Sequence, residues 1–391
     1  MKDRVRVLVV DDSALMRKLI PLVLARDPDI EVVGTAMDGH FALRKIAELR
    51  PDVITLDLEM PRMDGIETLR MIMRSAPLPV IVFSTHSKEG AYSTFKALAL
   101  GAIDFVTKPR DAVAGNLESV AFQLIEKIKV AKRAGGPKIL PKLDRDVVPV
   151  KKRAHSPLPP SRVIAIGIST GGPNALQYLL SQIPADIPAT FVVVQHMPEG
   201  FTDMFARRLD ECCALDIQEA NSGDLLLSGR VLICPGNRHI MVRRMPRGEL
   251  VVLSDSAPIN GHRPSADVLF HSVAQEFGIT AVGILMTGMG EDGAEGLGAI
   301  KAAGGMTIAQ SEESCVVPGM PRAAIQRGYA NKILSLDALG PYLINQYGAE
   351  RRPAEKTGSV EKSEKSDKSD KSDKSDKSDK HEKVSVSTPR G

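Results

Sequence analysis

Apolar residues in the first third of the chain recur in short runs, separated by stretches with helical spacing. Five runs are predicted to be buried strands: residues 6–10, 32–33, 53–56, 80–83 and 105–106. Three stretches are predicted to be amphipathic helices: residues 15–25, 65–72 and 117–134. This alternation predicts an α/β domain over residues 1–134, with a doubly wound, five-stranded parallel sheet covered by helices on both faces.

A second α/β pattern follows over residues 161–348. Its predicted strands are residues 163–167, 190–195, 231–234, 249–253, 280–286 and 306–309. Several of them are uninterrupted apolar runs, which is typical of strands covered on both faces. We therefore expect a three-layer α/β domain with a mostly parallel sheet.

Two segments lack any hydrophobic period. Residues 135–160 are rich in Pro, Lys and Arg and are predicted to be a semi-extended linker. Without interleaved aromatic residues, its basic charge favours a solvated connector over a nucleic-acid contact. Residues 349–391 contain five SDK triplets with alternating charge, which predicts a disordered, solvated tail.

Composition narrows the class of protein. A chain of 391 residues, with 43% apolar and 25% charged residues, predicts a soluble protein of two or three domains. The net charge of +3 indicates no polyanionic partner such as nucleic acid. We found no apolar window long enough for membrane insertion, and the first apolar run is too short for a signal peptide. The four cysteines have no C-x-x-C spacing, which favours reduced thiols and a cytoplasmic location.

Polar residues follow the predicted strands of the first domain. Asp11 and Asp12 come after the first strand, Asp57 after the third, Ser84 after the fourth and Lys108 after the fifth. Carboxyl ends of parallel strands meet at one edge of the sheet, so these side chains are expected to converge. Three carboxylates repel each other unless a cation lies among them, and Mg²⁺ is the natural candidate. The lysine and the hydroxyl suit phosphoryl oxygens.

The first domain resembles the receiver domain of response regulators, which has a flavodoxin-like fold. The matching stretches are VVDDS at 9–13, ITLDLEMPRMDGIE at 54–67, PVIVFS at 79–84 and GAIDFVTKP at 101–109. The resemblance implies that Asp57 accepts a phosphoryl group from a histidine kinase. It also implies that Asp11, Asp12 and the main-chain carbonyl of Glu59 hold Mg²⁺ with Asp57. Ser84 and Lys108 would bind the phosphoryl oxygens, and Phe105 takes the place of the switching aromatic residue.

The stretch VIAIGISTGGPNAL at 163–176 admits two interpretations. Residues 167–171 fit the G-x-S-x-G pattern of a nucleophile elbow centred on Ser169, whereas a glycine-rich loop after a strand also suits a phosphate. The dinucleotide interpretation is the weaker one, because the G-x-G-x-x-G spacing is missing. In addition, Gln195 and His196, rather than an acid, end the next strand.

A serine needs a base and an orienting acid to become a nucleophile. His196 follows a predicted strand directly and is the candidate base, although a lone histidine is more often structural. Asp292 lies in the glycine-rich turn TGMGEDGAEG and is the candidate acid. The same turn is also compatible with an ordinary helix start capped by Asp292 or Glu291. Its glycines allow backbone N–H groups to approach a ligand, as an oxyanion hole requires. The order Ser169, His196, Asp292 differs from that of α/β-hydrolases.

The second domain resembles the catalytic domain of the chemotaxis methylesterases, the CheB family. The matching stretches are IGISTGGPNAL, VVVQHMPEGFT, LICPGNRHI, HRPSADVLF and LMTGMGEDGAEG. The resemblance implies a Ser169 nucleophile, a His196 general base, an orienting Asp292 and an oxyanion contact from the backbone N–H of Met289, with no cofactor for the ester chemistry.

The same resemblance implies a substrate and a means of control. The substrates would be glutamyl γ-methyl esters, and glutamines for deamidation, on methyl-accepting chemoreceptors. The phosphodonor would be a chemotaxis histidine kinase. The unphosphorylated receiver would cover the catalytic cleft until Asp57 is phosphorylated, and the protein is expected to act as a monomer.

Two other classes of protein fit the sequence less well. A transcriptional response regulator would need a compact, basic DNA-binding output domain, but the second domain is long, α/β and not notably basic. A catalytically silent scaffold is disfavoured because Ser169, His196 and Asp292 are all present.

Overall fold

The structure is a computed structural model that describes residues 4–85, 87–108, 114–135, 158–246 and 248–348. The predicted linker over residues 135–160 lies almost entirely outside these ranges. The predicted tail over residues 349–391 lies wholly outside them. Within the described residues, no helix is both long and apolar enough to cross a membrane.

The N-terminal sheet has five parallel strands in the order β2-β1-β3-β4-β5. The strands are β1 (Val5–Val10), β2 (Ile30–Ala36), β3 (Val53–Asp57), β4 (Val80–Ser84) and β5 (Asp104–Thr107). The helices are α1 (Met16–Leu24), α2 (Gly39–Leu49), α3 (Gly65–Ser75), α4 (Lys88–Ala99) and α5 (Ala114–Ala134). The prediction of a doubly wound, five-stranded parallel sheet is confirmed. The strand order reverses between β1 and β3, which is where such folds bind ligands.

The C-terminal sheet has seven parallel strands in the order β14-β13-β12-β6-β7-β9-β8. The strands are β6 (Arg162–Ile168), β7 (Ala189–Gln195), β8 (Asp216–Glu219), β9 (Arg230–Ile233), β12 (Ala281–Leu285), β13 (Met306–Gln310) and β14 (Lys332–Leu334). The helices are α6 (Gly172–Leu180), α7 (Phe201–Cys212), α8 (Ala266–Phe277), α9 (Ala294–Ala302), α10 (Gly319–Gln326) and α11 (Leu336–Tyr347). Short 3₁₀ turns occupy Gly278–Thr280 and Glu312–Ser314.

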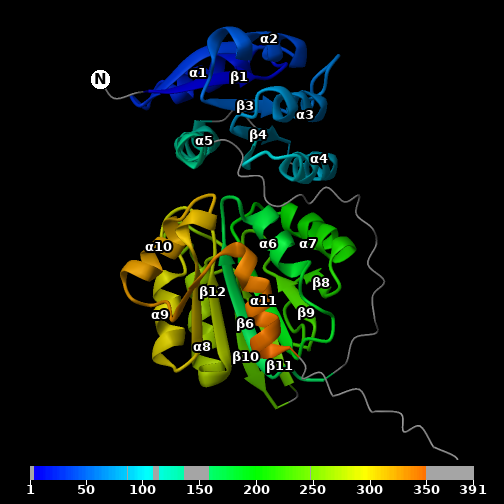
Figure 1. Cartoon of the computed structure of the whole chain (residues 1–391), viewed down its shortest axis with the longest axis vertical. Coiled ribbons are helices and arrows are strands. Elements are labelled where there is room, and N and C mark those ends of the chain that lie inside the picture. The colour runs from blue at the N-terminus through cyan, green and yellow to red at the C-terminus, as the bar shows by residue number, and fades with distance from the viewer. Residues whose placement is uncertain (1–3, 86, 109–113, 136–157, 247, 349–391) are drawn as a thin grey trace, which may run out of the picture. The chain divides into compact units, whose positions relative to one another are not determined.

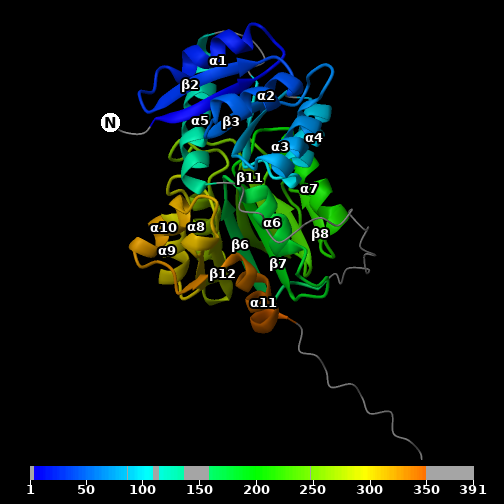
Figure 2. The same ribbon diagram turned by 45° about the horizontal axis from the view of Figure 1, so that its top comes forward.

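Alternation along β6 explains the layers of this second domain. Val163 and Ala165 pack with residues of α8 and α9, whereas Ile164 and Ile166 pack with residues of α6, α7 and α11. Successive side chains of a strand point to opposite faces, so a strand that is apolar throughout needs cover on both sides. The ribbon views show these helices around β6 and β12 (Figures 1 and 2).

Three strands were missed and one was assigned to the wrong sheet. The predicted strand at 249–253 is β11 (Gly248–Ser254), and it pairs antiparallel with β10 (His239–Met245) in a separate hairpin. β8 and β14 lie at the two edges of the main sheet, and β10 contains two consecutive arginines just before its last residue. Edge and hairpin strands have a face open to water, so none of them presents the continuous apolar run on which the prediction relied.

Candidate functional site

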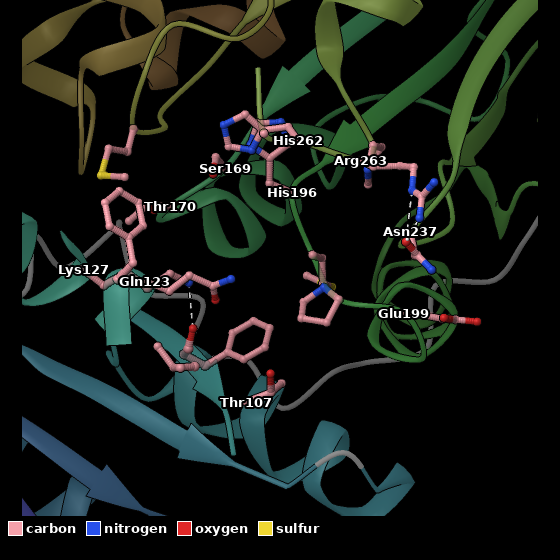
Figure 3. A pocket seen from close by; sticks show the side chains of 18 residues that line it. Thr107, Gln123, Lys127, Ser169, Thr170, His196, Glu199, Asn237, His262 and Arg263 are labelled. Atoms are coloured by element: carbon pink, nitrogen blue, oxygen red, sulfur yellow. Dashed lines mark hydrogen bonds between the residues drawn. The ribbon is translucent and has the colours of Figure 1, made fainter. Parts of the chain in front are cut away.

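Three predicted residues of the second domain meet at the carboxyl ends of neighbouring strands. Ser169 follows β6, His196 follows β7, and Asp292 lies in the loop after β12. The sheet order β12-β6-β7 brings these three ends together. The Nε2 atom of His196 lies 2.8 Å from Oδ2 of Asp292. Ser169 and His196 line the same cavity (Figure 3).

Asp292 determines which nitrogen of His196 carries the proton. Burial favours the neutral acid, but the hydrogen bond and charge of His196 outweigh it and lower the pKa of Asp292 below its ordinary value. A carboxylate can only accept hydrogen bonds, so Nε2 of a neutral His196 donates and Nδ1 holds the lone pair. This Nδ1 atom is buried and makes no hydrogen bond. The free acceptor is therefore available to a neighbouring hydroxyl.

The start of helix α8 holds the carboxylate of Asp292. Oδ1 accepts a hydrogen bond from the hydroxyl of Ser265 at 2.6 Å, and Oδ2 accepts one from the backbone N–H of Ala266 at 2.6 Å. Charge-assisted bonds and the positive end of a helix both favour the ionised acid. Ser265 is not among the residues predicted from the sequence, although a serine directly before a helical pattern is a recognisable N-cap signal.

Two glycines allow the backbone to approach Ser169. Gly171 adopts φ +75°, a left-handed conformation that turns the chain from β6 into α6. A Cβ atom on Gly288 would lie 2.8 Å from Cβ of Ser169. The backbone N–H of Ser169 donates to the carbonyl of Thr287 at 2.9 Å, which fixes the loop. Met289, the predicted oxyanion contact, lines the same cavity as Ser169.

The cavity around Ser169 has a volume of about 580 Å³ and is lined by residues of both domains. Phe105 of β5, with Phe122 and Lys127 of α5, lines it together with Ser169 and His196. Figure 3 shows Lys127 within the same cavity view as Ser169 and His196. The cleft that contains the nucleophile candidate is therefore partly walled by receiver residues.

Two stacked pairs of aromatic rings join β5 and α4 to helix α7. The ring of Phe105 stacks on that of Phe201, with centroids 4.9 Å apart. The ring of Phe95, on α4, stacks on that of Phe205, with centroids 5.4 Å apart. Stacked aromatic pairs contribute about 0.5–1.5 kcal/mol beyond the area they bury. Phe105, predicted as the switching aromatic residue, is thus buried in this contact.

The acidic residues predicted for the first domain also converge. Ligand atoms of Asp11, Asp12 and Asp57 all lie within 4.8 Å of one another. Lys108 places its Nζ atom 2.6 Å from Oδ2 of Asp57 and 3.2 Å from Oδ2 of Asp11. Burial raises the pKa of Asp57 to about 6, and it raises the pKa of Asp11 as well. A hard cation among these oxygens would relieve that cost, so the donor set fits Mg²⁺.

In this structure the hydroxyl of Ser84 bonds to helix α4. Its hydroxyl donates to the carbonyl of Gly90 at 3.0 Å and accepts from the hydroxyl of Thr94 at 2.6 Å. Both partners belong to α4, so Ser84 is committed to that helix. Glu59 donates its backbone N–H to Oδ1 of Asp57 at 3.2 Å. The roles of Ser84 as a phosphoryl ligand and of the Glu59 carbonyl as a metal ligand stay predictions.

The chain is similar to known proteins over both of its domains. Residues 164–343 match the family model of the CheB methylesterase, and residues 7–115 match the response regulator receiver domain. A protein-glutamate methylesterase/protein-glutamine glutaminase of Koribacter versatilis is 60% identical over 89% of this chain and 97% of its own length. One of Syntrophotalea carbinolica is 46% identical over 90% of this chain and 100% of its own length. The solved catalytic domain of Thermotoga maritima CheB methylesterase is 38% identical, covering 47% of this chain and 97% of that one, with a TM-score of 0.46.

The fold and the paired sites define a response regulator whose output domain is a hydrolase. The chain belongs to the family of protein-glutamate methylesterases/protein-glutamine glutaminases.

Proposed function

We propose that this protein hydrolyses glutamyl γ-methyl esters on chemoreceptors through Ser169, His196 and Asp292, under control of phosphorylation at Asp57. The observation that carries the proposal is the 2.8 Å bond between Nε2 of His196 and Asp292, which leaves Nδ1 of His196 buried and unpaired, while His196 and Ser169 line the same cavity. Family membership supplies the substrate class, because the relatives are named for this activity.

Acylation follows from the tautomer of His196. Nδ1 takes the proton of the Ser169 hydroxyl while Oγ attacks the ester carbonyl carbon, and Asp292 stabilises the imidazolium that forms. The tetrahedral intermediate then expels methoxide, which takes the proton from Nδ1 and leaves as methanol. A γ-glutamyl ester of Ser169 remains.

The developing oxyanion needs donors that are already in position. The backbone N–H of Met289 is our candidate, because its loop lies against Ser169 at Gly288 and Met289 itself lines the cavity. One such donor is typically worth a factor of about 10²–10³ in kcat. The Gly288 contact explains why the loop comes this close.

Deacylation uses the same groups in reverse. Water loses a proton to Nδ1 of His196 and attacks the acyl carbon, and the proton returns to Oγ of Ser169 as the glutamate carboxylate leaves. A glutamine side chain passes through the same geometry and releases ammonia in place of methanol, which accounts for the deamidase activity in the relatives' names.

The receiver carries the control. Asp11, Asp12, Asp57 and the carbonyl of Glu59 would hold Mg²⁺, which supplies charge to neutralise the incoming phosphoryl oxygens. Lys108 is already within 2.6 Å of Asp57 and would move to those oxygens. A chemotaxis histidine kinase is the proposed phosphodonor.

The last part of the proposal concerns how phosphorylation opens the cleft around Ser169. Phe105, Phe122 and Lys127 occupy its wall in this structure, so a receptor segment would meet receiver side chains on entry. We propose that phosphorylation loosens this wall and gives the substrate access to Ser169. A nearly complete shift between two such states requires about 5.5 kcal/mol of differential stabilisation, whereas a smaller value gives graded activation.

The test measures methanol released from methylated receptor membranes, with and without a small phosphodonor and Mg²⁺. Wild type, Ser169→Ala and Asp57→Ala are compared, and Ser181→Ala serves as a matched control because Ser181 is exposed at the end of α6. We expect release to require Ser169 and to rise with phosphodonor only where Asp57 is present. Wild type that stays inactive after verified phosphorylation would overturn the proposed substrate, and an active Ser169→Ala would overturn the nucleophile.

A further inference from the structure

A second histidine lies flat against the proposed base. The rings of His196 and His262 have centroids 4.2 Å apart and planes only 9° from parallel. His262 also lines the cavity that contains Ser169, and Figure 3 shows the two imidazoles overlapping beside that serine. The mechanism above assigns His262 no role.

The backbone around His262 is fixed independently of the triad. His262 and Ile259 exchange both backbone hydrogen bonds, at 2.8 and 3.0 Å. The neighbouring guanidinium of Arg263 donates twice to Oδ1 of Asn237, at 2.7 and 3.0 Å, and once to the carbonyl of Asp255. His262 therefore projects from a braced loop, and its ring is a firm surface for His196.

His196 needs such a surface because one hydrogen bond does not fix a ring. The bond from Nε2 to Asp292 sets one point, but the imidazole can still rotate about that direction and turn Nδ1 away from Ser169. A flat ring stacked on one face opposes this rotation. Misplacement of a catalytic group by about 1 Å can cost a factor of about 10² in rate.

The charge of His262 suits this role. Burial, and then the charge of His196, lower the pKa of His262 to about 4. His262 is thus neutral at neutral pH and presents an aromatic face to His196. When His196 becomes an imidazolium during the reaction, the stack places a cation on that face, which is a favourable arrangement.

We propose that His262 is a positioning residue, whose stacked ring holds His196 in the plane that joins Asp292 to Ser169. The inference rests on the proposed esterase function. The aromatic face of His262 positions His196, and the nitrogens of His262 take part in no proton transfer.

The variants distinguish the role of the flat ring of His262 from that of its nitrogens. His262→Phe keeps a flat aromatic face and removes both nitrogens, whereas His262→Leu keeps volume without a flat ring and His262→Ala removes both. His271→Ala is the matched control, since His271 is an exposed residue on the adjoining helix α8. Leu takes the place of Ala should the smaller variant fail to fold by circular dichroism.

Two readouts are measured on the full-length, phosphorylated protein. The first is the kcat and KM of methanol release from methylated receptor membranes. The second is the rate at which a fluorophosphonate labels Ser169, which reports activation of the nucleophile without the receptor. We expect His262→Ala and His262→Leu to lose about 10- to 100-fold in kcat and in labelling rate, with KM changed less than about threefold. His262→Phe should recover to within about fivefold of wild type in both readouts.

Three results would overturn the inference. Ala and Leu variants as fast as wild type would show that the stack does nothing for catalysis. A folded Phe variant as slow as Ala would assign the role to the imidazole nitrogens. A rise in KM alone would make His262 a wall for the substrate. If wild type labels at Ser169 yet releases no methanol, the proposed substrate fails while the labelling series still decides the role of His262.

Discussion

The two sites of this protein differ in how each stabilises the charge of a buried aspartate. Both place a buried aspartate at the carboxyl edge of a parallel sheet. Asp292 receives bonds from His196, Ser265 and the backbone of Ala266, and its pKa is lowered despite burial. Asp57 has Lys108 as its cation but shares it with Asp11, and burial raises the pKa of Asp57 to about 6.

The difference shows which site is complete. The chain itself supplies hydrogen-bond partners for both oxygens of Asp292, the proposed orienting acid, before any ligand arrives. In the receiver, Lys108 pairs with Asp57 and Asp11, and Asp12 adds a third carboxylate to the cluster, so the remaining charge calls for a cation. The carboxylate of Asp292 is therefore fully bonded within the chain, whereas the receiver cluster needs a bound cation to balance its charge.

The largest effect should come from breaking the complete site. Asp292→Asn replaces an acceptor by an amide that can donate to Nε2, which favours the tautomer with the proton on Nδ1. We expect kcat for methanol release to fall by about 10³–10⁴ with little change in the fold. Asp216→Asn, which disrupts a pair with Arg230 at the amino ends of β8 and β9, is the control. A fall of less than tenfold would mean that Asp292 does not orient the base.

The second prediction concerns the incomplete site. Asp57→Asn should abolish stimulation by phosphodonor and Mg²⁺, because no carboxylate remains to accept the phosphoryl group. Basal release should stay within about threefold of wild type, since Asp57 does not line the cavity with Ser169. Asp52→Asn, just before the start of the same strand, should respond to phosphodonor as wild type does. Stimulation that survives in Asp57→Asn would place the phosphorylation elsewhere.

A pH experiment sharpens the contrast in the catalytic half. The pKa of His262 is about 4 in the folded chain, against an ordinary value of 6.5. Between these pH values His262 is protonated in the unfolded chain but neutral in the folded chain. The free energy of unfolding therefore falls as the pH drops from about 6.5 towards 4. His262→Phe removes this contribution to the pH dependence of stability. Its loss of unfolding free energy between pH 7 and 4.5, measured with urea, should be smaller than that of wild type by about 1–2 kcal/mol, allowing for the partial exposure of the ring.

In that experiment His271→Ala is again the comparison, because His271 is exposed. Equal acid sensitivity in wild type and His262→Phe would mean that His262 is protonated as readily in the folded chain as in the unfolded one. The neutral stack described above would then not exist at mildly acidic pH.

The smallest effect should come from the bond that holds Ser84 to α4. Ser84 has to leave Thr94 and the Gly90 carbonyl before it can bind a phosphoryl oxygen. Thr94→Val keeps the shape of the side chain and removes one hydrogen bond, typically worth about 0.5–1.5 kcal/mol. The phosphodonor concentration for half-maximal methanol release should fall by about two- to tenfold. An unchanged or higher concentration would show that this bond does not restrain activation.

Much of the architecture followed from the sequence because it depends on buried strands. The runs ending at Val10, Leu56 and Phe83 are mostly apolar, and their ends mark where Asp11, Asp57 and Ser84 lie. The same logic placed Ser169 and His196 at neighbouring strand ends. Convergence at an edge is a property of parallel sheets, so no side-chain detail was needed.

What the sequence could not provide depends on loops and rotamers. Ser265 and His262 reach the site from a segment between the β10–β11 hairpin and α8, and no period in the sequence ties that segment to β6 or β7. The partner of the Ser84 hydroxyl depends on its rotamer, and only the folded structure shows that it bonds to Thr94 and Gly90.

The shared cavity wall makes communication between the two sites run in both directions. If phosphorylation of Asp57 favours withdrawal of Phe105 and Lys127 from the cleft, then any molecule that occupies the cleft and displaces them must favour phosphorylation by the same factor. A receptor segment seated at Ser169 would thus raise the affinity of the receiver for a phosphoryl mimic. Substrate would then act as an effector of its own enzyme.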